Sequence, residues 1–568
     1  MYLIPSVKEA KEGEKRELKG CTIVFPEGVD PRLLNVAKKL PNGEVKVVFS
    51  IDSSDSEEYK IIFGDTINVE AKGTKGAFYA IQTLRQIVKN GYYDVSEITD
   101  SPDFSVRGFY LDITRGRIPT VETVKDLIDN LAYYKANMLQ LYVEHVFPFK
   151  EYDGIYQRTG YITPDELKEI DAYCQENFID FVPSLSCFGH LYELLESDKY
   201  KHLCELTNDE HKTHFWQRRM AHHTINPSDP ESIEVIKSLI DQYMPCFTSN
   251  YFNICCDETF DLGKGKNQGK DPSQLYTAFV KQIVDYVRSK GKIPMMWGDV
   301  IEHIDPLGDN IIFLNWGYSP NEKPDKIYNL AKAGKTQFVC PGISGWTTLC
   351  ERIKESVPNI TKMAHYGKEV NAKGLLNTCW GDYGHIVPME ACMYGTIFGC
   401  AKSWNEGDNY EEFDGAMDLL YYGYQGGANF VKTIDKAHRV TYWYDLVCDY
   451  SNQIFKQEVM RAWNTPTVDG LEEAYYELED IIPYLQGTKW ENEGAREALL
   501  IVAQGTQYMI SMLFSRATGG KLGVIFSDIE EWMKSYSELY LSESKDGELK
   551  EFLKVFYALG EKYIKKDK

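Results

Sequence analysis

Residues 251–260 read YFNICCDETF, a pattern typical of a buried strand that runs into two adjacent carboxylates, Asp257 and Glu258. Neighbouring side chains on a strand point to opposite faces, so both acids reach one ligand only where the strand ends and the backbone turns. Residues 261–265, DLGKG, predict such a turn. An isolated acidic pair also fits a helix cap or a solvated surface. The position of this pair within a series of strand–helix units favours a functional role.

Strand-like and helical patterns alternate along the middle of the chain. The expected strands are Val106–Ile113, Met138–Val143, Ile179–Leu185, Tyr251–Cys256, Ile293–Trp297, Ile311–Asn315, Gln337–Pro341 and Gly374–Cys379. The expected helices between them are Thr120–Ala136, Pro164–Asn177, Ser228–Met244, Pro272–Ser289, Asp325–Ala333 and Pro358–Val370. Eight such units predict an α/β fold of the (β/α)8 TIM-barrel type. The short interval between the fifth and sixth strands allows a missing helix there, and no Gly-x-Gly-x-x-Gly motif follows the first strand, which disfavours a dinucleotide fold.

Two other regions flank the expected barrel. Residues 1–100 mix short strands with two helical stretches, 31–40 and 76–89, and predict an N-terminal α+β non-catalytic domain. Residues 101–405 form the expected catalytic barrel. Residues 406–568 are helical in pattern, rich in Tyr and Leu, and predict a C-terminal helical domain without chemistry of its own.

Composition excludes several classes of partner. The 568 residues carry 62 basic and 85 acidic side chains, a net charge of −23, so neither a nucleic acid nor an anionic membrane is expected as a partner. By inspection no apolar run spans a bilayer, and the start MYLIP does not resemble a secretory signal. Thirteen cysteines without paired Cys-x-x-Cys spacing suggest reduced, packed thiols in a cytoplasmic protein. A homodimer is compatible with the sequence.

The active site of a barrel forms at the C-terminal ends of its strands. Tryptophans stand at or just beyond four of these ends, among carboxylates. They are Trp297, Trp316, Trp346 and Trp380. A single tryptophan usually belongs to a core, but four at one solvent-facing rim suit the flat apolar faces of sugar rings, and carboxylates suit sugar hydroxyls. The rim therefore predicts carbohydrate binding with general acid–base chemistry.

The ordered motifs resemble glycoside hydrolase family 20, the β-N-acetylhexosaminidases, in a divergent form. Residues 76–86, GAFYAIQTLRQ, are similar to a helix of that family's N-terminal domain, and residues 107–115, RGFYLDITR, to its first barrel strand. Residues 135–137, KAN, resemble the end of its first barrel helix, and Gly189-His190 its strand-three histidine. Asp257-Glu258 stands where the family has its catalytic acids. The resemblance covers roughly residues 20–405.

The resemblance implies hydrolysis in which the substrate's own 2-acetamido oxygen is the nucleophile and an oxazolinium ion the intermediate. Glu258 is then the general acid and later the base. Asp257 orients the acetamido group, and His190 supports the acid. Arg107 and Asp382 are expected to bind sugar hydroxyls, and Trp297, Trp316 and Trp380 to form the walls of the sugar site.

The chain departs from the family pattern at several positions. Cys255-Cys256 replaces a glycine pair, and Glu144 is expected in place of the acid on the second strand. The tyrosine that binds the acetamido carbonyl is not obvious after strand seven. Its candidates are Tyr318 and Tyr383, with Trp346 nearby. Strand eight ends in Trp380-Gly381-Asp382 rather than Trp-x-Glu, which leaves the choice between GlcNAc and GalNAc open.

Three alternatives remain at this stage. One is a barrel glycosidase with an ordinary carboxylate nucleophile, and another is a non-catalytic carbohydrate-binding protein. The third, metal catalysis, rests on Glu144-His145 and His222-His223, but adjacent residues on a strand seldom converge on one ion. No cofactor and no metal are expected.

Overall fold

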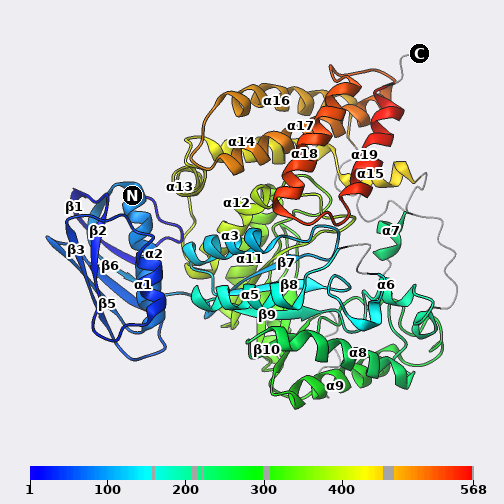
Figure 1. The fold of residues 1–568 in the computed structure, drawn as a ribbon, viewed down its shortest axis with the longest axis horizontal. Coiled ribbons are helices and arrows are strands. Elements are labelled where there is room, and N and C mark those ends of the chain that lie inside the picture. The colour runs from blue at the N-terminus through cyan, green and yellow to red at the C-terminus, as the bar shows by residue number, and fades with distance from the viewer. Residues whose placement is uncertain (156–159, 207–213, 221–222, 299–306, 452–465, 566–568) are drawn as a thin grey trace.

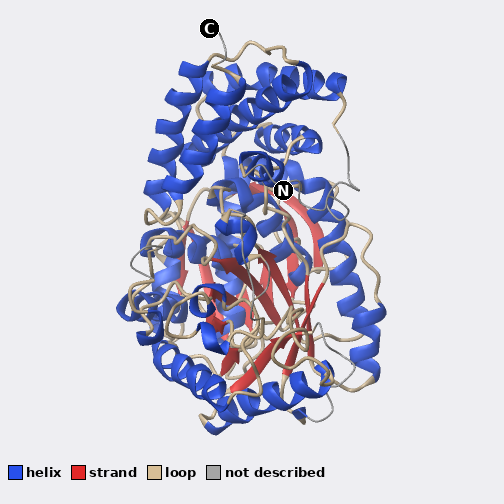
Figure 2. Cartoon of the chain, turned by 90° about the vertical axis from the view of Figure 1, so that its right-hand side faces the viewer, coloured by secondary structure: helices blue, strands red, loops and turns tan. Residues whose placement is uncertain are grey.

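The computed structural model of the protein describes residues 1–155, 160–206, 214–220, 223–298, 307–451 and 466–565. Figure 1 shows three parts: an N-terminal sheet domain at the left, a barrel at the centre and a group of helices above it. The 90° rotation in Figure 2 shows the barrel strands surrounded by helices, with the C-terminal helices stacked over one side.

The N-terminal domain is a six-stranded sheet in the order β1-β6-β4-β5-β3-β2. Its elements are β1 (Glu9–Glu17), β2 (Cys21–Val24), α1 (Pro31–Ala37), β3 (Val45–Ile51), β4 (Tyr59–Ile62), β5 (Thr66–Ala71), α2 (Thr74–Asn90) and β6 (Tyr92–Asp100). The sequence pattern predicts strands at residues 21–25, 45–51 and 59–64, which correspond to β2, β3 and β4, but it does not predict β1, β5 or β6. Every residue of β1 is exposed, so the strand is held by pairing with β6 and shows no apolar alternation.

Eight parallel strands close into a barrel in the order β10-β11-β12-β13-β14-β7-β8-β9, which confirms the predicted fold. They are β7 (Val106–Asp112), β8 (Met138–Val143), β9 (Asp180–Leu185), β10 (Tyr251–Asn253), β11 (Ile293–Trp297), β12 (Ile312–Trp316), β13 (Gln337–Cys340) and β14 (Gly374–Cys379). The expected strand at 251–256 ends early, at Asn253, because Cys255 and Cys256 have φ values of 56° and 63° and turn the chain away.

Seven α-helices of the described chain surround the barrel. They are α3 (Val121–Tyr133), α5 (Pro164–Glu176), α8 (Pro230–Tyr243), α9 (Pro272–Ser289), α10 (Asp325–Lys332), α11 (Ile353–Glu369) and α12 (Met393–Trp404). The capping box of α5 forms as its sequence indicates, with Thr163 and Glu166 bonding each other's backbone N–H. The start expected at Pro358 was wrong, because α11 begins at Ile353 and contains the proline. Residues 299–306, where a helix was expected to be missing, lie outside the described residues.

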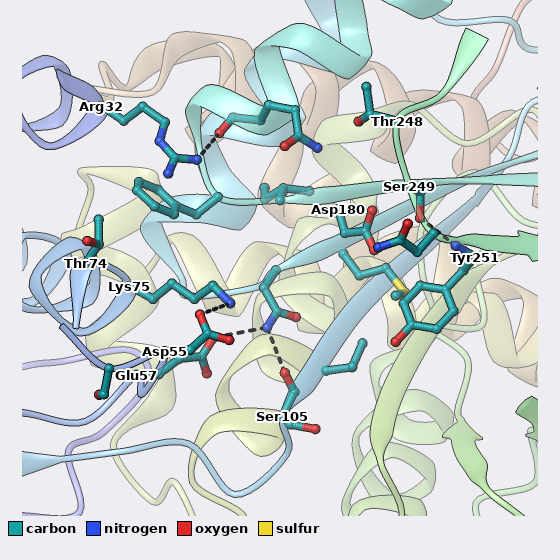
Figure 3. A pocket seen from close by; sticks show the side chains of 18 of the residues that line it. Arg32, Asp55, Glu57, Thr74, Lys75, Ser105, Asp180, Thr248, Ser249 and Tyr251 are labelled. Atoms are coloured by element: carbon teal, nitrogen blue, oxygen red, sulfur yellow. Dashed lines mark hydrogen bonds and ion pairs between the residues drawn. The ribbon is translucent and has the colours of Figure 1, made fainter. Parts of the chain in front are cut away.

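The N-terminal domain is joined to the barrel by buried charged side chains. Lys135 Nζ lies 2.9 Å from Asp100 Oδ2, and both residues are almost completely buried. A pocket of about 680 Å³ opens beside this junction, at the N-terminal ends of the strands (Figure 3). Its charged groups include Asp55 and Lys75, 2.8 Å apart, and it lies at the end of the barrel opposite to Asp257 and Glu258. We therefore assign it to the domain junction rather than to the active site.

The C-terminal region is helical, as expected. Its α-helices are α13 (Phe413–Met417), α14 (Gly427–Ala437), α15 (Trp443–Tyr450), α16 (Val468–Gly487), α17 (Glu493–Thr518), α18 (Phe526–Glu543) and α19 (Leu549–Tyr563). The continuous helix expected over residues 429–457 breaks between α14 and α15. Contrary to the expectation that no apolar run spans a bilayer, α17 is long and apolar enough to cross a membrane, but 83% of its apolar window is buried, as in the core helix of a folded domain.

Candidate active site

Several residues at the C-terminal rim of the barrel have a strained backbone conformation. Positive φ values occur at Cys255 (56°), Cys256 (63°), Glu258 (49°) and His190 (58°), none of which is glycine. Side-chain-bearing residues adopt this region at a cost of about 1–3 kcal/mol each, and such residues concentrate at functional sites. The two cysteines occupy the positions where the resemblance places glycines, so the conformation is retained although the glycines are not. Cys255 is buried, with its Sγ 3.4 Å from Ser184 Oγ.

His190 joins the two acids predicted to be catalytic. Its Nε2 lies 3.3 Å from Asp257 Oδ2 and 3.4 Å from Glu258 Oε2. Burial lowers the pKa of His190, but the charge of Asp257 and hydrogen bonds to both carboxylates outweigh it and hold the pKa well above its usual 6.5. The raised pKa favours a protonated imidazole between the two carboxylates, and the predicted convergence of these three residues is present in the structure.

Arg115 organises a second group of carboxylates beside the first. Its Nη1 lies 2.7 Å from Asp382 Oδ1 and 3.2 Å from Asp112 Oδ2, and its Nη2 lies 3.8 Å from Glu144 Oε1. Glu144 Oε1 also lies 4.0 Å from Nδ1 of His190, so this carboxylate connects the two groups. A buried guanidinium with its fork directed at acids can also bind neighbouring hydroxyls of a sugar.

The substrate-binding role predicted for Arg107 was wrong. Arg107 is the second residue of β7 and lies at the N-terminal end of the barrel, whereas Arg115 follows the C-terminal end of the same strand. The Arg107 guanidinium contacts Glu57 Oε2 at 2.7 Å and Tyr79 Oη at 2.9 Å, both in the N-terminal domain. Since Arg107 is 1% exposed, it joins the domains and has no route to a ligand at the opposite end.

Glu144 is buried beside Tyr142, which donates a hydrogen bond to Glu144 Oε1 at 2.8 Å. Burial raises the pKa of Glu144, while the charges of Arg115, His190 and Arg219 oppose this rise. Asp382 is more open, with 23% of its side chain exposed. Both predicted acids therefore lie on the Arg115 side of the site.

Aromatic rings line the inside of the barrel below these acids. Trp297 and Trp380 lie 5.6 Å apart, and each packs within about 5 Å of Tyr110, so they form the floor of the site. Trp297 is 1% exposed and belongs as much to the core as to a sugar wall.

A second aromatic set stands higher at the rim. Tyr318 stacks on Trp316 at 5.3 Å and contacts Trp346 at the same distance, while its hydroxyl accepts a hydrogen bond from Trp380 Nε1 at 2.7 Å. Tyr383 instead packs its ring on Tyr444 of the C-terminal region at 4.5 Å. Of the two tyrosines proposed to replace the family's tyrosine, Tyr318 is therefore the one embedded among the tryptophans.

The donor atoms of His190, Asp257 and Glu258 lie within 4.8 Å of one another, a spacing that a metal ion could also use. Of the metal ligands considered from the sequence, Glu144 and His145 are adjacent, with His145 Nδ1 3.9 Å from Glu144 Oε2, and His222 lies outside the described residues. Two carboxylates and an imidazole can equally hold a proton between them, which is the reading that His190's raised pKa supports.

Three residues of the site were missed or misassigned from the sequence. Arg115 ends the motif of residues 107–115, but the sugar-binding role was predicted for Arg107 at its start. The rule that barrel sites lie at the C-terminal ends of strands separates these two arginines and would have selected Arg115. Asp112 holds Arg115 and accepts the Gly381 backbone N–H at 3.0 Å. Tyr142 lies within the largely apolar sequence of β8, so nothing in the sequence distinguishes it from the buried residues around it.

Comparisons with known proteins agree with this geometry. The model "Glycosyl hydrolase family 20, catalytic domain" matches residues 104–346, and "Glycosyl hydrolase family 20, domain 2" matches residues 6–101. A β-hexosaminidase of Porphyromonas gingivalis is 25% identical over 275 residues, which is 42% of this chain and 34% of that protein.

Solved structures show the same fold. A β-N-acetylhexosaminidase of Bacteroides fragilis aligns with a TM-score of 0.60 and 20% identity, over 74% of this chain and 95% of its own. A chitobiase of Flavobacterium johnsoniae aligns with a TM-score of 0.61 and 16% identity, over 95% and 98%. This chain spans only between 25% and 57% of the length of four of the curated relatives it matches.

Proposed function

The chain belongs to glycosyl hydrolase family 20, and from this premise we propose that it is an exo-acting, retaining β-N-acetylhexosaminidase. The proposed reaction removes a terminal β-linked GlcNAc or GalNAc from a glycan or glycoconjugate. Its nucleophile is the 2-acetamido oxygen of the substrate, and its intermediate is an oxazolinium ion.

The observation that carries the proposal is the contact of His190 Nε2 with both Asp257 and Glu258. Two adjacent carboxylates would repel each other, and the imidazolium between them lowers that repulsion. Glu258, with 24% of its side chain exposed, is the more accessible acid and is assigned to protonate the leaving oxygen and then to activate water. Asp257, 13% exposed, is assigned to the acetamido N–H, where it stabilises the positive charge that develops.

Arg115 and the carboxylates around it are assigned to bind the sugar hydroxyls. Arg115, Glu144 and Asp382 lie together on one side of His190, so a ring placed over Trp380 can present its 3-, 4- and 6-hydroxyls to them. The hydroxyl of Tyr318 is the proposed donor to the acetamido carbonyl. Trp297 and Trp316 are the proposed walls around the acetamido methyl group.

Distance alone does not separate this mechanism from one with an enzyme nucleophile. The carboxylate oxygens of Asp257 and Glu258 lie within 4.8 Å, close to the roughly 5–5.5 Å typical of retaining enzymes that form a covalent ester. The test is a set of aryl β-glycosides of GlcNAc, GalNAc, glucose and galactose. The proposal expects turnover only of the two acetamido sugars, and comparable turnover of glucosides would favour the conventional nucleophile.

A metal-dependent hydrolase is the second candidate, supported by the spacing of His190, Asp257 and Glu258. The proposed mechanism has these groups hold protons instead. Dialysis against a chelator is expected to leave kcat/KM unchanged. Loss of activity that added Zn²⁺ restores would select the metal mechanism.

A cytoplasmic location is also proposed. All thirteen cysteines are free thiols, and twelve of them are buried. This supports a reducing compartment, where disulfides are rare. Fractionation of the source cells with detection of the protein would test it.

A further inference from the structure

The loop that follows Arg115 is held by residues from the far end of the chain. We define the C-terminal brace as Tyr536, Tyr540, Glu543, Lys545 and Glu548, which lie at the end of α18 and the start of α19. These elements follow Arg115 by more than 400 residues, yet Figure 1 shows α18 and α19 reaching down toward the barrel. The catalytic-domain family model ends at residue 346, so the brace lies outside the part of the chain that it matches.

Backbone groups of the loop between Gly116 and Thr120 form hydrogen bonds with the C-terminal brace. The carbonyl of Gly116 accepts the Tyr540 hydroxyl at 2.5 Å and the Glu548 N–H at 3.0 Å. The Ile118 carbonyl accepts the Lys545 N–H at 2.9 Å. Thr120 donates its N–H to the Glu543 carbonyl at 3.0 Å. The path of the loop is therefore held by the C-terminal brace in addition to its contacts within the barrel.

Arg117, the second residue after Arg115, is held by its side chain. Its Nη1 lies 2.6 Å from Glu543 Oε2, and its guanidinium stands over the Tyr540 ring at 4.2 Å. The Arg117 side chain is 4% exposed and that of Glu543 13%, so the ion pair is largely buried, and removal of one partner from such a pair is costly.

The same brace reaches the other loop that holds Arg115. Tyr536 donates its hydroxyl to the Ile386 carbonyl at 2.7 Å, and Glu543 Oε2 accepts the Met389 N–H at 3.2 Å. These residues follow Asp382, the ion-pair partner of Arg115, in the strand-eight loop. One short segment therefore contacts both the loop that carries Arg115 and the loop that carries Asp382, which meet in the ion pair between these two residues.

Gly116 permits this close approach. Its φ is 110°, and a Cβ built there would lie 2.8 Å from Glu548 Oε2. Glu548 also accepts hydrogen bonds from Arg219 at 2.6 and 2.9 Å and from Trp216 Nε1 at 2.5 Å, so it is itself immobilised.

We propose that the C-terminal brace positions Arg115 for the sugar, so that Tyr540, Glu543 and Glu548 are positioning residues for the reaction. The inference rests on the proposed function and extends it: the helical region, expected from its sequence to carry no chemistry, completes the hydroxyl-binding side of the site. A brace that served stability alone would lower the melting temperature without changing substrate binding.

The first test is Tyr540→Phe, which removes a single hydroxyl. We expect KM for GlcNAc aryl glycosides and Kd for GlcNAc to rise on the order of three- to tenfold, measured well below the melting temperature. In an Arg115→Lys background the same change should cause little further loss, because its effect passes through Arg115. Equal losses in both backgrounds, or a lower Tm with unchanged kinetics, would overturn the proposal.

The matched control is Glu477→Gln, which breaks ion pairs of Glu477 with Lys436 and Arg439 inside the helical region. It should leave KM unchanged. Glu543→Gln is a second positioning variant and should raise KM in the same way as Tyr540→Phe.

Hydrogen exchange of residues 116–120 provides a measurement independent of activity. Tyr540→Phe should speed exchange in this loop, whereas the control should not. A parent enzyme inactive on every glycoside would overturn the proposed function only. Unchanged exchange in Tyr540→Phe would contradict the proposal that the C-terminal brace positions this loop.

Discussion

The Nη1 atom of Arg115 lies 2.7 Å from Oδ1 of Asp382, which connects the loop after the first barrel strand to the loop after the eighth. These loops are 267 residues apart in sequence, but their strands β7 and β14 are neighbours in the closed barrel. Arg115 also lies near Glu144, Glu144 lies 4.0 Å from His190 Nδ1, and His190 contacts Asp257 and Glu258. The hydroxyl-binding and acid–base groups therefore form one connected polar network.

Arg115→Lys should impair catalysis, whereas Arg107→Lys should impair stability. Lysine keeps the charge but loses the fork, so Arg115→Lys should lower kcat/KM by roughly ten- to a hundredfold. Arg107→Lys breaks contacts with Glu57 and Tyr79 and should lower Tm with little change in kcat/KM. Kinetics at 25 °C and thermal unfolding of both variants check this. A selective kinetic loss in Arg107→Lys would return the sugar-binding role to that residue.

Glu258→Gln should nearly abolish hydrolysis of natural glycosides. Loss of a general acid costs roughly 10²- to 10⁴-fold in rate. Aryl glycosides with very good leaving groups need less protonation and should lose less in their first step. The measurement is kcat for an unactivated disaccharide and for an activated aryl glycoside. If the disaccharide were hydrolysed at the parent rate, Glu258 would not be the acid.

The 2-acetamido group should be required for turnover. A plain 2-hydroxyl offers no internal nucleophile, so such glycosides should be poor substrates. A thiazoline that mimics the oxazolinium ion should inhibit, and Asp257→Asn should weaken that inhibition because a charge partner is lost. The inhibition constants of parent and variant check this. A covalent sugar ester trapped on the enzyme would contradict it.

Strand positions were predictable because apolar runs bounded by turns mark buried parallel strands. The limits of β8, β11 and β14 were predicted to the residue. The shortened β10 was not predictable, because positive φ at Cys255 and Cys256 arises from the surrounding site and not from cysteine propensity. The sugar-binding role predicted for Arg107 was wrong because it came from the match to the family motif alone, whereas the rule that barrel sites lie at the C-terminal ends of strands selects Arg115. The C-terminal brace had no sequence signal, since its bonds go largely to backbone carbonyls and N–H groups.

His190 should make stability depend on alkaline pH. Its folded-state pKa is raised above the unfolded value of about 6.5, so the folded state binds the proton more tightly. The stabilisation is fully present below about pH 6.5 and is lost as the pH rises through the folded pKa. The Tm difference between the parent and His190→Gln should therefore shrink as pH rises. A difference that grew with pH would mean that the histidine is neutral in the folded protein.

The choice between C4 epimers should depend on Asp382. We expect GalNAc to be accepted at least comparably to GlcNAc, because Asp382 is one methylene shorter than the glutamate of the family pattern and a contact to an equatorial 4-hydroxyl is lost. Arg115 and Glu144 remain near the same position and can bind the axial hydroxyl instead. A buried hydroxyl without a partner costs about 1–3 kcal/mol, or roughly ten- to a hundredfold in discrimination, enough to reverse a preference. The measurement is kcat/KM for matched GlcNAc and GalNAc aryl glycosides in the parent and in Asp382→Glu, which should shift the ratio toward GlcNAc. A strong GlcNAc preference in the parent, unchanged by the substitution, would show that Asp382 does not distinguish the two configurations at C4.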